Sequence, residues 1–451
     1  MNSKPFKRAN PSPARLIAFD LVTQVNRGGA FANLRLPELL AESNLEQRDR
    51  AFATELSYGT LRMQGKHDYA ITKKIDRPFA ELDEKVVDIL RLGVHQIFEM
   101  RVPVHAAVGE TVELARAVAG ESKASYVNAL LRAIASDPDI YTELKIDESV
   151  ENLEKLAILY SHPKWIISAY FDQLKDWDAV VELLKMNNVP AAPQIVAWPG
   201  KSTVAEILET GGSKLPIGTY SVQSDHLPNE YPAIKDKRAG IQDMGSQLVA
   251  EIFFGTSDSK SQSWLDLCAG PGGKAALLNN LLTENFPNAK FLANEPSEHR
   301  AELVARVVPK SKIISFDGRN SSEFGETFDR ILIDAPCSGL GALRRRPEAR
   351  WRRSINDLKE LLPLQRDLID SAYEMLNVGG VIGFATCSPL LAETKGQVLD
   401  AMYRHKDLEL LNIADFSPAG EVGVNPDGTL QLWTHLQECD SMFLALLKRT
   451  A

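Results

Sequence analysis

One stretch of the sequence decides the class of fold: Trp264-Leu265-Asp266-Leu267-Cys268-Ala269-Gly270-Pro271-Gly272-Gly273-Lys274. It joins an apolar run to a helical pattern through a turn rich in glycine. Such a turn brings the backbone close to a ligand, and glycine permits both this approach and a positive φ. From about Gly240 onward, short apolar runs alternate with helical stretches, which is typical of βαβ units. Residues 236–451 are therefore predicted to form an α/β domain that binds a ligand at this turn.

The expected elements of this domain alternate along the chain. Strands are predicted at Trp264–Leu267, Phe291–Ala293, Ile313–Ser315, Phe328–Asp334, Val381–Thr386 and Met442–Leu447. Helices are predicted from the glycine turn to about Leu282, and at Ser297–Val308, Ser354–Leu376 and Leu391–His405.

The region before residue 140 has the pattern of an all-α domain. Its clearest helix carries an apolar stripe at three- and four-residue spacing, formed by Val86, Val87, Leu90, Val94, Ile97 and Phe98. Pro103 interrupts the helical pattern, and Asp137-Pro138-Asp139 closes it. Because strand signals are absent here, residues 1–140 are predicted to form a helical domain.

Residues 141–235 are predicted to form a small α/β connector. Helices are expected at Val150–Tyr160, Lys164–Leu174 and Trp177–Lys185. Repeated prolines then indicate short strands and turns, of which Gln194–Trp198 is the clearest strand.

The composition narrows the class of protein. A chain of 451 residues is too long for one ordinary core, so two or three domains are expected. The formal charge of −9 means that any nucleic-acid contact requires a local basic patch. The four cysteines have no C-x-x-C spacing, so neither a zinc site nor a disulfide framework is indicated. No membrane helix is expected, and no apolar segment follows the basic residues Lys4, Lys7 and Arg8, so a signal peptide is not expected either. We therefore expect a cytoplasmic monomer without a metal.

Two cysteines follow predicted strands. Cys337 lies in Asp334-Ala335-Pro336-Cys337-Ser338-Gly339, and Cys387 lies in Ala385-Thr386-Cys387-Ser388-Pro389. The carboxyl ends of parallel strands form the edge of a sheet where ligands bind. Two thiols at this edge, one beside an aspartate, indicate nucleophilic chemistry more than packing.

The glycine turn indicates a nucleotide-like cofactor. It is not a Walker loop, because Ala275 follows Lys274, but Gly270, Gly272 and Ala275 fit G-x-G-x-x-A loosely. Glu295, about twenty residues further on, ends the second strand, where an acidic residue binds ribose hydroxyls in either a nicotinamide or an S-adenosylmethionine enzyme. Asp317, after the third strand, can accept a hydrogen bond from an adenine amino group, or it is a surface aspartate in a turn.

A basic cluster follows the first thiol. Arginine suits phosphate, and tryptophan can stack on a base, so the cluster is predicted to bind RNA; the alternative is a solvated basic helix end. Its members are Arg344, Arg345, Arg346, Arg350, Trp351, Arg352 and Arg353.

Four pieces of the helical region carry a family resemblance: Arg15-Leu16-Ile17-Ala18, Thr54-Glu55-Leu56-Ser57-Tyr58-Gly59-Thr60-Leu61-Arg62, His105-Ala106-Ala107-Val108-Gly109-Glu110-Thr111-Val112-Glu113-Leu114 and Val127-Asn128-Ala129-Leu130-Leu131-Arg132. They resemble the NusB-like transcription-antitermination fold. This resemblance implies an RNA-binding domain; a helical appendage that only stabilises or positions the enzyme is the alternative.

The glycine turn and the two cysteine motifs together resemble the RNA 5-methylcytosine methyltransferases, and most closely the bacterial members that act on small-subunit (16S) ribosomal RNA and carry a NusB-like domain. The resemblance spans nearly the whole chain. It implies a Rossmann-like sheet with a reversed last strand, S-adenosylmethionine as the methyl donor and carbon 5 of cytosine as the acceptor.

The resemblance also implies residue roles. Cys387 is the expected nucleophile, Cys337 assists product release, Asp334 contacts the base and Lys274 reaches toward the reacting centre. The resemblance further implies that the cofactor pocket is lined by Cys268, Ala269, Gly270, Pro271, Gly272, Gly273, Lys274, Glu295, Asp317 and Asp334.

The sequence departs from the family pattern at three places. Many relatives have alanine where this chain has Gly270, and aspartate is commoner than Glu295. After Cys387 many relatives have Glu-Asn, where this chain has Glu393-Thr394, and no role is assigned to this pair.

Other functions stay open at this point. They are a non-catalytic RNA-binding assembly factor, a methyltransferase that acts on another RNA such as tRNA or on DNA, and a nicotinamide dehydrogenase that rests only on the loose glycine match.

Overall fold

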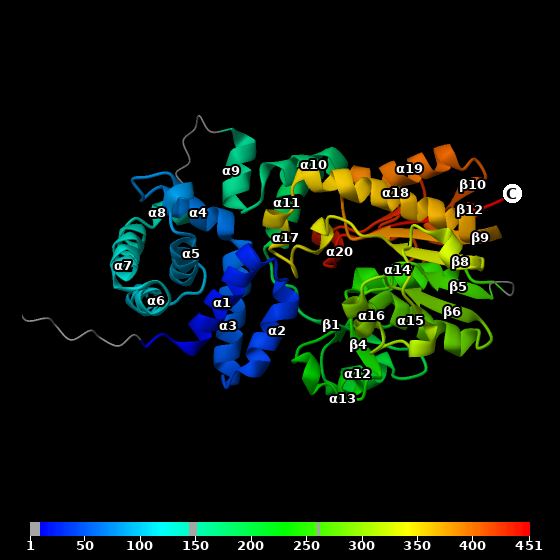
Figure 1. Ribbon diagram of the computed structural model, residues 1–451, viewed down its shortest axis with the longest axis horizontal. Coiled ribbons are helices and arrows are strands. Elements are labelled where there is room, and N and C mark those ends of the chain that lie inside the picture. The colour runs from blue at the N-terminus through cyan, green and yellow to red at the C-terminus, as the bar shows by residue number, and fades with distance from the viewer. Residues whose placement is uncertain (1–9, 144–150, 259–261) are drawn as a thin grey trace, which may run out of the picture. The chain divides into compact units, whose positions relative to one another are not determined.

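The computed structural model describes residues 10–143, 151–258 and 262–451 (Figure 1). Lys4, Lys7, Arg8 and the first residue of the expected helix Val150–Tyr160 lie outside them. The chain forms two compact units. The first comprises residues 1–168 and 345–352, and the second comprises residues 169–344 and 353–451.

The first unit is helical, as predicted. Its helices are α1 (Pro13–Gly28), α2 (Ala32–Glu42), α3 (Gln47–Arg62), α4 (Gln64–Thr72), α5 (Glu84–Phe98), α6 (Val104–Ala119), α7 (Glu121–Ala135), α8 (Asp139–Thr142), α9 (Asn152–Leu159) and α17 (Ala349–Arg352). No strand occurs among the described residues of this unit. The predicted apolar stripe of α5 faces one core shared with α1, α3, α6 and α7. Asp83 starts this helix by accepting hydrogen bonds from the backbone N–H groups of Lys85 and Val86.

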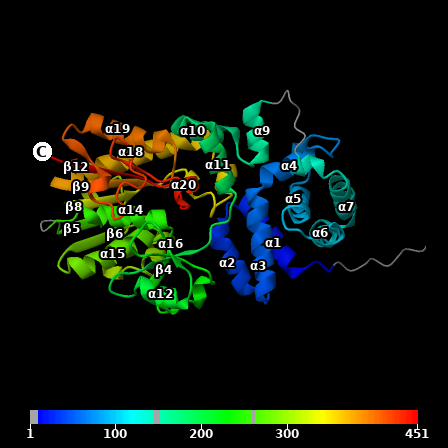
Figure 2. The same cartoon turned by 180° about the vertical axis from the view of Figure 1, so that it is seen from behind.

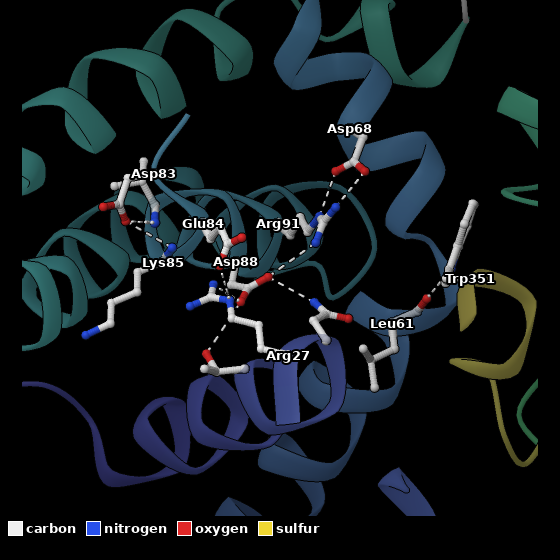
Figure 3. A network of polar contacts seen from close by, with 12 residues as sticks. Arg27, Leu61, Asp68, Asp83, Glu84, Lys85, Asp88, Arg91 and Trp351 are labelled. Carbon is white, nitrogen blue, oxygen red and sulfur yellow. Dashed lines mark hydrogen bonds and ion pairs between the residues drawn. The ribbon is translucent and has the colours of Figure 1, made fainter. Parts of the chain in front are cut away.

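A buried polar network links α1, α4 and α5 (Figure 3). Arg91 forms a two-pronged pair with Asp68, with both nitrogen–oxygen distances at 2.7 Å. Asp88, almost fully buried, accepts from Arg27 at 2.6 Å, Asn26 at 2.9 Å and Arg91 at 3.2 Å. A buried carboxylate is stable only when donors satisfy it, so this network fixes how the three helices pair.

Residues 345–352 pack within the first unit. Arg350 is fully buried and donates to the carbonyl oxygens of Ser161 at 3.1 Å and Arg62 at 3.4 Å. The indole N–H of Trp351 donates to the Leu61 carbonyl at 3.0 Å (Figure 3). Arg352 donates to the carbonyl oxygens of Val25 and Ala30. These side chains therefore satisfy backbone carbonyl oxygens of the helical unit.

The second unit begins with a small antiparallel sheet. Its strand order is β2 (Ser213–Lys214), β3 (Ser221–Gln223), β1 (Gln194–Ala197) and β4 (Ala239–Ile241). Two helices precede β1 in sequence: α10 (Lys164–Leu174), whose residues up to Ser168 belong to the first unit, and α11 (Trp177–Asn187). The helices α12 (Val204–Thr210) and α13 (Pro232–Lys235) lie between strands of this sheet in sequence. Ile195, Ile207, Val222 and Tyr231 form its own small core.

The main sheet has the strand order β10-β12-β9-β8-β5-β6-β7, with β11 paired to β12. Its strands are β5 (Ser263–Asp266), β6 (Lys290–Asn294), β7 (Ile313–Ile314), β8 (Phe328–Asp334), β9 (Leu376–Thr386), β10 (Leu408–Leu411), β11 (Leu430–Gln431) and β12 (Phe443–Arg449). The strands from β7 to β9 are parallel, whereas β12 runs antiparallel to β9. The Rossmann-like sheet with a reversed last strand is therefore confirmed. The strand order turns at β5, which is where such sheets bind ligands.

Helices cover both faces of this sheet (Figures 1 and 2). On one face lie α14 (Met244–Gly255), α15 (Gly273–Asn285) and α16 (Glu298–Val304); on the other lie α18 (Leu358–Met375) and α19 (Lys395–Arg404). Each face of the sheet has its own hydrophobic core, and strand residues point alternately to the two faces. Leu332 of β8 belongs to the core that includes α14 and α15, and its neighbours Ile331 and Ile333 belong to the core that includes α18 and α19. This packing holds the ends of β5, β8 and β9 in fixed register.

Candidate active site

The two thiols meet at the carboxyl ends of β8 and β9. These neighbouring parallel strands pair Asp334 with Ala385, and the Ala335 N–H donates to the Ala385 carbonyl at 2.9 Å. Beyond the strand ends, the Gly341 N–H donates to the Cys387 carbonyl, also at 2.9 Å. The result is a distance of 3.4 Å between Cys337 Sγ and Cys387 Sγ. Two cysteines that lie fifty residues apart in sequence thus share one site.

Lys274 and Asp334 form an ion pair beside the thiols. Lys274 lies in the first turn of α15, and its Nζ is 2.9 Å from Asp334 Oδ2. Burial disfavours the ammonium, but Asp334 outweighs it and raises the pKa of Lys274, with a smaller contribution from Cys387. Lys274 is therefore a fixed cation between the glycine turn and the thiol loops.

Asp266 ends β5 in a fully buried position. Burial raises its pKa to about 7, Asp334 adds to the rise, and Lys274 opposes it. Neither carboxylate oxygen reaches hydrogen-bond geometry with a described residue, although the Cys268 N–H lies close enough to favour the charged form. An unsatisfied carboxyl at the switch point of the sheet suits a ligand with hydrogen-bond donors.

Glu295 lies beside the glycine turn. Its carboxylate accepts from the Gly270 N–H at 3.1 Å and from the Ser297 N–H at 3.0 Å, and Arg300 lies 3.4 Å away. Asn294, just before it, bridges the carbonyls of Leu267 and Phe316 at 3.1 Å each. The Asn294 side chain thereby connects the end of β6, on which it lies, to the end of β5 and to the loop after β7.

Asp317 lies at the outer edge of this region. It holds Arg319 in a fork, with a shortest distance of 2.6 Å, and the guanidinium lowers the pKa of this carboxyl. Cys268 lies in the turn itself, and burial raises its pKa well above the ordinary value and so keeps this thiol protonated.

Three residues at the site were missed from the sequence. Asp266 was quoted within the turn without a role, although a charge inside the apolar run Trp264–Leu267 was a usable signal. Arg300 contacts Glu295 and the Gly270 carbonyl, and no motif pointed to it. Glu393 is completely buried and contacts Ser338 and Ser388, each of which follows a thiol.

The arginine cluster is divided by its contacts. Arg350, Trp351 and Arg352 donate to carbonyls of the helical unit. In the second unit Arg344 donates to the carbonyls of Val189 and Glu438, and Arg353 donates to that of Ser338 at 3.1 Å. RNA contact by the cluster stays a prediction, and it depends on the partly exposed arginines rather than on the buried Arg350.

Among the described residues, no helix has the length and apolar character needed to span a bilayer. No group of three or more histidine, cysteine or acidic side chains in the same part of the chain has the arrangement of a metal site.

Comparison with protein families matches residues 257–448 to the 16S rRNA methyltransferase RsmB/F family and residues 12–136 to the NusB family. Among curated relatives, the Mycobacterium tuberculosis protein Rv1407 is 41% identical over 98% of each chain, and its name marks methyltransferase activity as provisional. The ribosomal RNA small subunit methyltransferase B of Pseudomonas syringae is 30% identical over 92% of this chain and 91% of its own.

Solved structures share the fold. The crystal structure of PH0851 matches with a TM-score of 0.80 at 21% identity, covering 98% of this chain and 100% of its own. A methyltransferase homologue from Pyrococcus horikoshii matches with a TM-score of 0.53 at 19% identity, covering 67% of this chain and 100% of its own.

The open sheet with its reversed strand and the family match together define a methyltransferase with an added helical domain. More particularly, the chain belongs to the 16S rRNA methyltransferase RsmB/F family, in the form that carries a NusB-family domain at its N-terminal side.

Proposed function

We propose that the protein transfers a methyl group from S-adenosylmethionine to carbon 5 of a cytosine in small-subunit (16S) ribosomal RNA, through a covalent cysteine–cytosine adduct. The observation that carries this proposal is the 3.4 Å distance between the two thiol sulfurs, beside Lys274 and Asp334. The relatives named ribosomal RNA small subunit methyltransferase B support the choice of RNA.

The chemistry explains what each thiol of the pair can do: one suffices for addition, and the second can assist release. Carbon 5 of cytosine is too weak a nucleophile to attack a methyl group unaided. A thiolate that adds to carbon 6 converts the ring into an enamine, which is nucleophilic at carbon 5. Once carbon 5 has gained the methyl group, its proton leaves and the thiol is eliminated. With two sulfurs in one site, one can bond to carbon 6 of the cytosine while the other assists release of the methylated base.

We assign Cys387 as the nucleophile and Cys337 as the group that assists release. Cys387 lies close enough to Lys274 for a thiolate there to raise the lysine's pKa, and this attraction is mutual. The pKa of Cys337 is raised well above its ordinary value by its hydrogen bond with Cys387 and by burial. In this proposal Asp334, which is paired with Lys274, accepts a hydrogen bond from the cytosine amino group.

The residues around the turn fit S-adenosylmethionine. This cofactor, when bound, supplies a methyl group activated on a sulfonium cation. Asp266 offers unsatisfied acceptor oxygens, the start of α15 offers backbone N–H groups, and Glu295 offers a carboxylate for ribose hydroxyls. The remaining turn residues Cys268 to Gly273 and Asp317 complete the proposed pocket. A solved relative in fold carries SFG in its name, and this agrees with such a pocket.

RNA binding is proposed for the partly exposed arginines of the cluster and for the NusB-family domain. Positive side chains would hold the phosphates, while the thiol site reads the base. We propose that the protein acts as a monomer in the cytoplasm.

The proposal is tested with purified protein, labelled S-adenosylmethionine and four substrates: 16S rRNA, tRNA, an RNA oligomer and the matching DNA oligomer. We expect label in 16S rRNA, and bisulfite mapping of rRNA from a deletion strain should reveal one lost 5-methylcytosine. Calorimetry should detect S-adenosylmethionine binding and no NAD binding. Methyl transfer to tRNA alone would mean that tRNA, and not 16S rRNA, is the substrate. Absence of transfer to any RNA would favour a non-catalytic assembly factor.

A further inference from the structure

Glu393 joins the two thiol loops. It ends a short 3₁₀ turn, Leu391–Glu393, and is completely buried. One carboxylate oxygen accepts from the Ser338 N–H at 2.8 Å, and the other accepts from the hydroxyls of Ser338 at 2.5 Å and Ser388 at 2.6 Å. Ser338 directly follows Cys337, and Ser388 directly follows Cys387. One carboxylate therefore binds the residue next to each thiol.

A second contact extends this arrangement to α18. Gln365 Nε2 donates to Glu393 at 3.2 Å and to the Pro336 carbonyl at 2.9 Å, and Pro336 directly precedes Cys337. The Cys337 loop is thus held on both sides of the thiol. Hydrogen bonds to a buried carboxylate are stronger than neutral ones, so loss of Glu393 would leave several buried donors unsatisfied at once.

The charges on the two sides of the thiol pair are opposite. Glu393 contributes to raising the pKa of Cys337, after the larger effects of the hydrogen bond with Cys387 and of burial. On the other side, Lys274 and Cys387 attract each other. An anion beside one sulfur and a cation beside the other distinguish two side chains of the same chemical type.

We propose that Glu393 is the positioning residue of the thiol pair: its carboxylate clamps the Cys337 and Cys387 loops together and keeps negative charge on the Cys337 side, so that the two cysteines take different roles. The naming of these roles rests on the proposed function. The clamp itself is a property of the chain without RNA or cofactor.

The test compares alkylation of the two thiols by iodoacetamide across pH, followed for each cysteine by mass spectrometry of the full-length protein. In the unaltered protein Cys387 should react first at neutral pH. In Glu393→Gln, which keeps the shape without the charge, the Cys337 profile should move to lower pH, and its rate at pH 7 should rise about tenfold. In Glu393→Ala, which removes the clamp as well, the two rates should converge.

Glu251→Gln is the matched control. Glu251 is a buried carboxylate of the same unit that accepts from the Thr219 N–H at 2.9 Å and contacts neither thiol loop. Its loss should lower stability without changing either alkylation profile. If Glu393→Ala does not fold, Glu393→Gln and Glu393→Asp carry the test. Alkylation profiles in folded Glu393 variants that match those of the unaltered protein would overturn the proposal.

Methyl transfer is measured on the same variants. A positioning role predicts that Glu393→Gln lowers kcat by at least about tenfold with little change in KM for RNA, because the RNA contacts stay. If the unaltered protein methylates no RNA while the alkylation profiles shift as expected, the proposed function fails and the clamp stands. If it methylates RNA and the profiles do not shift, the clamp fails alone.

Discussion

Gly270 and Glu295 occupy a space that fits one combination of side chains. A Cβ atom added at Gly270 would lie 2.2 Å from Glu295 Oε2 and 2.9 Å from Arg300 Nε. At both positions the sequence resemblance leads us to expect another residue, alanine at the first and aspartate at the second. The structure explains the two departures as a pair, because the longer carboxylate fills the volume that an alanine methyl would need.

Gly270→Ala alone should therefore weaken S-adenosylmethionine binding by about tenfold or more, while Gly270→Ala combined with Glu295→Asp should restore most of it. Calorimetric titration of the unaltered protein, both single variants and the double variant measures the coupling. Additive losses in the double variant would show that the two positions act independently.

Asp266 makes stability depend on pH. Its pKa rises from 3.8 in the unfolded chain to about 7 in the folded protein. Between these values the folded state keeps a proton that the unfolded chain has lost, so stability falls as pH rises through this window. Asp266→Asn cannot ionise. It should equal the unaltered protein below pH 4 and exceed it by about 2–4 kcal/mol above pH 7.

Thermal melting at pH 4.5, 6 and 8 measures this difference, with Asp317→Asn as a control whose aspartate has a lowered pKa. Because the folded pKa of Asp317 lies below the 3.8 of the unfolded chain, its contribution is complete at all three pH values, so Asp317→Asn should differ from the unaltered protein by a constant amount. A melting temperature of Asp266→Asn below that of the unaltered protein at pH 8 would mean that the carboxylate has a stabilising partner.

At the scale of single residues, the sequence predicts those site residues that stand in recognisable short motifs. Cys337, Cys387, Lys274 and Asp334 stand in short motifs at strand ends, and the structure brings them together. Glu393 could not be assigned, because its role depends on Ser338, 55 residues away. Arg300 likewise depends on contacts with Glu295 and the Gly270 carbonyl, which no local pattern reveals.

At the scale of elements, the predicted strands are close to those observed, but some boundaries differ and one helix was missed. The helix expected from Ser354 begins at Leu358, because Ser354 and Asp357 form a capping box around a 3₁₀ turn. The β9 strand begins at Leu376, directly after α18. Almost every residue of α14 is buried, so it has no polar face and no amphipathic period, and it was not predicted.

The segment 345–352 shows that an arginine in a basic cluster can have a structural role instead of a surface role. A cluster of arginines predicts a phosphate surface, yet Arg350 is buried and satisfies backbone carbonyls. Sequence patterns report charge but not burial, so the two uses of arginine cannot be separated without coordinates.

Arg350→Ala should destabilise the helical unit by about 2 kcal/mol or more, because carbonyl acceptors in a buried position lose their donor. Arg346→Ala, at a partly exposed position, should leave the melting temperature nearly unchanged. Differential scanning calorimetry of both variants measures this. The opposite outcome, a stable Arg350→Ala that has lost RNA affinity, would assign Arg350 to RNA instead.

For the whole molecule, the chain order is not the order of the compact units. Residues 345–352 belong with the first unit although they lie far along the chain. A division by sequence pattern into residues 1–140, 141–235 and 236–451 follows the change from a helical to an α/β pattern, but a local pattern cannot reveal such an insertion.

A fragment of residues 1–168 should therefore be less stable than the same unit in the full chain, because it lacks Glu348, Arg350 and Trp351. A synthetic peptide of residues 343–354 should raise its melting temperature, and the same peptide with Arg350 and Trp351 replaced by alanine should not. Equal melting of the fragment with and without the peptide would mean that these contacts contribute nothing.

The most direct test of the account is covalent trapping on RNA. Purified Cys337→Ala, incubated with S-adenosylmethionine and 16S rRNA, should form a complex that survives a denaturing gel, because the adduct to Cys387 forms but is not released. Cys387→Ser should form no complex and transfer no methyl group, since a hydroxyl adds poorly to carbon 6. A trapped complex with Cys387→Ser, or methyl transfer that persists without Cys387, would contradict the assignment of this thiol as the nucleophile.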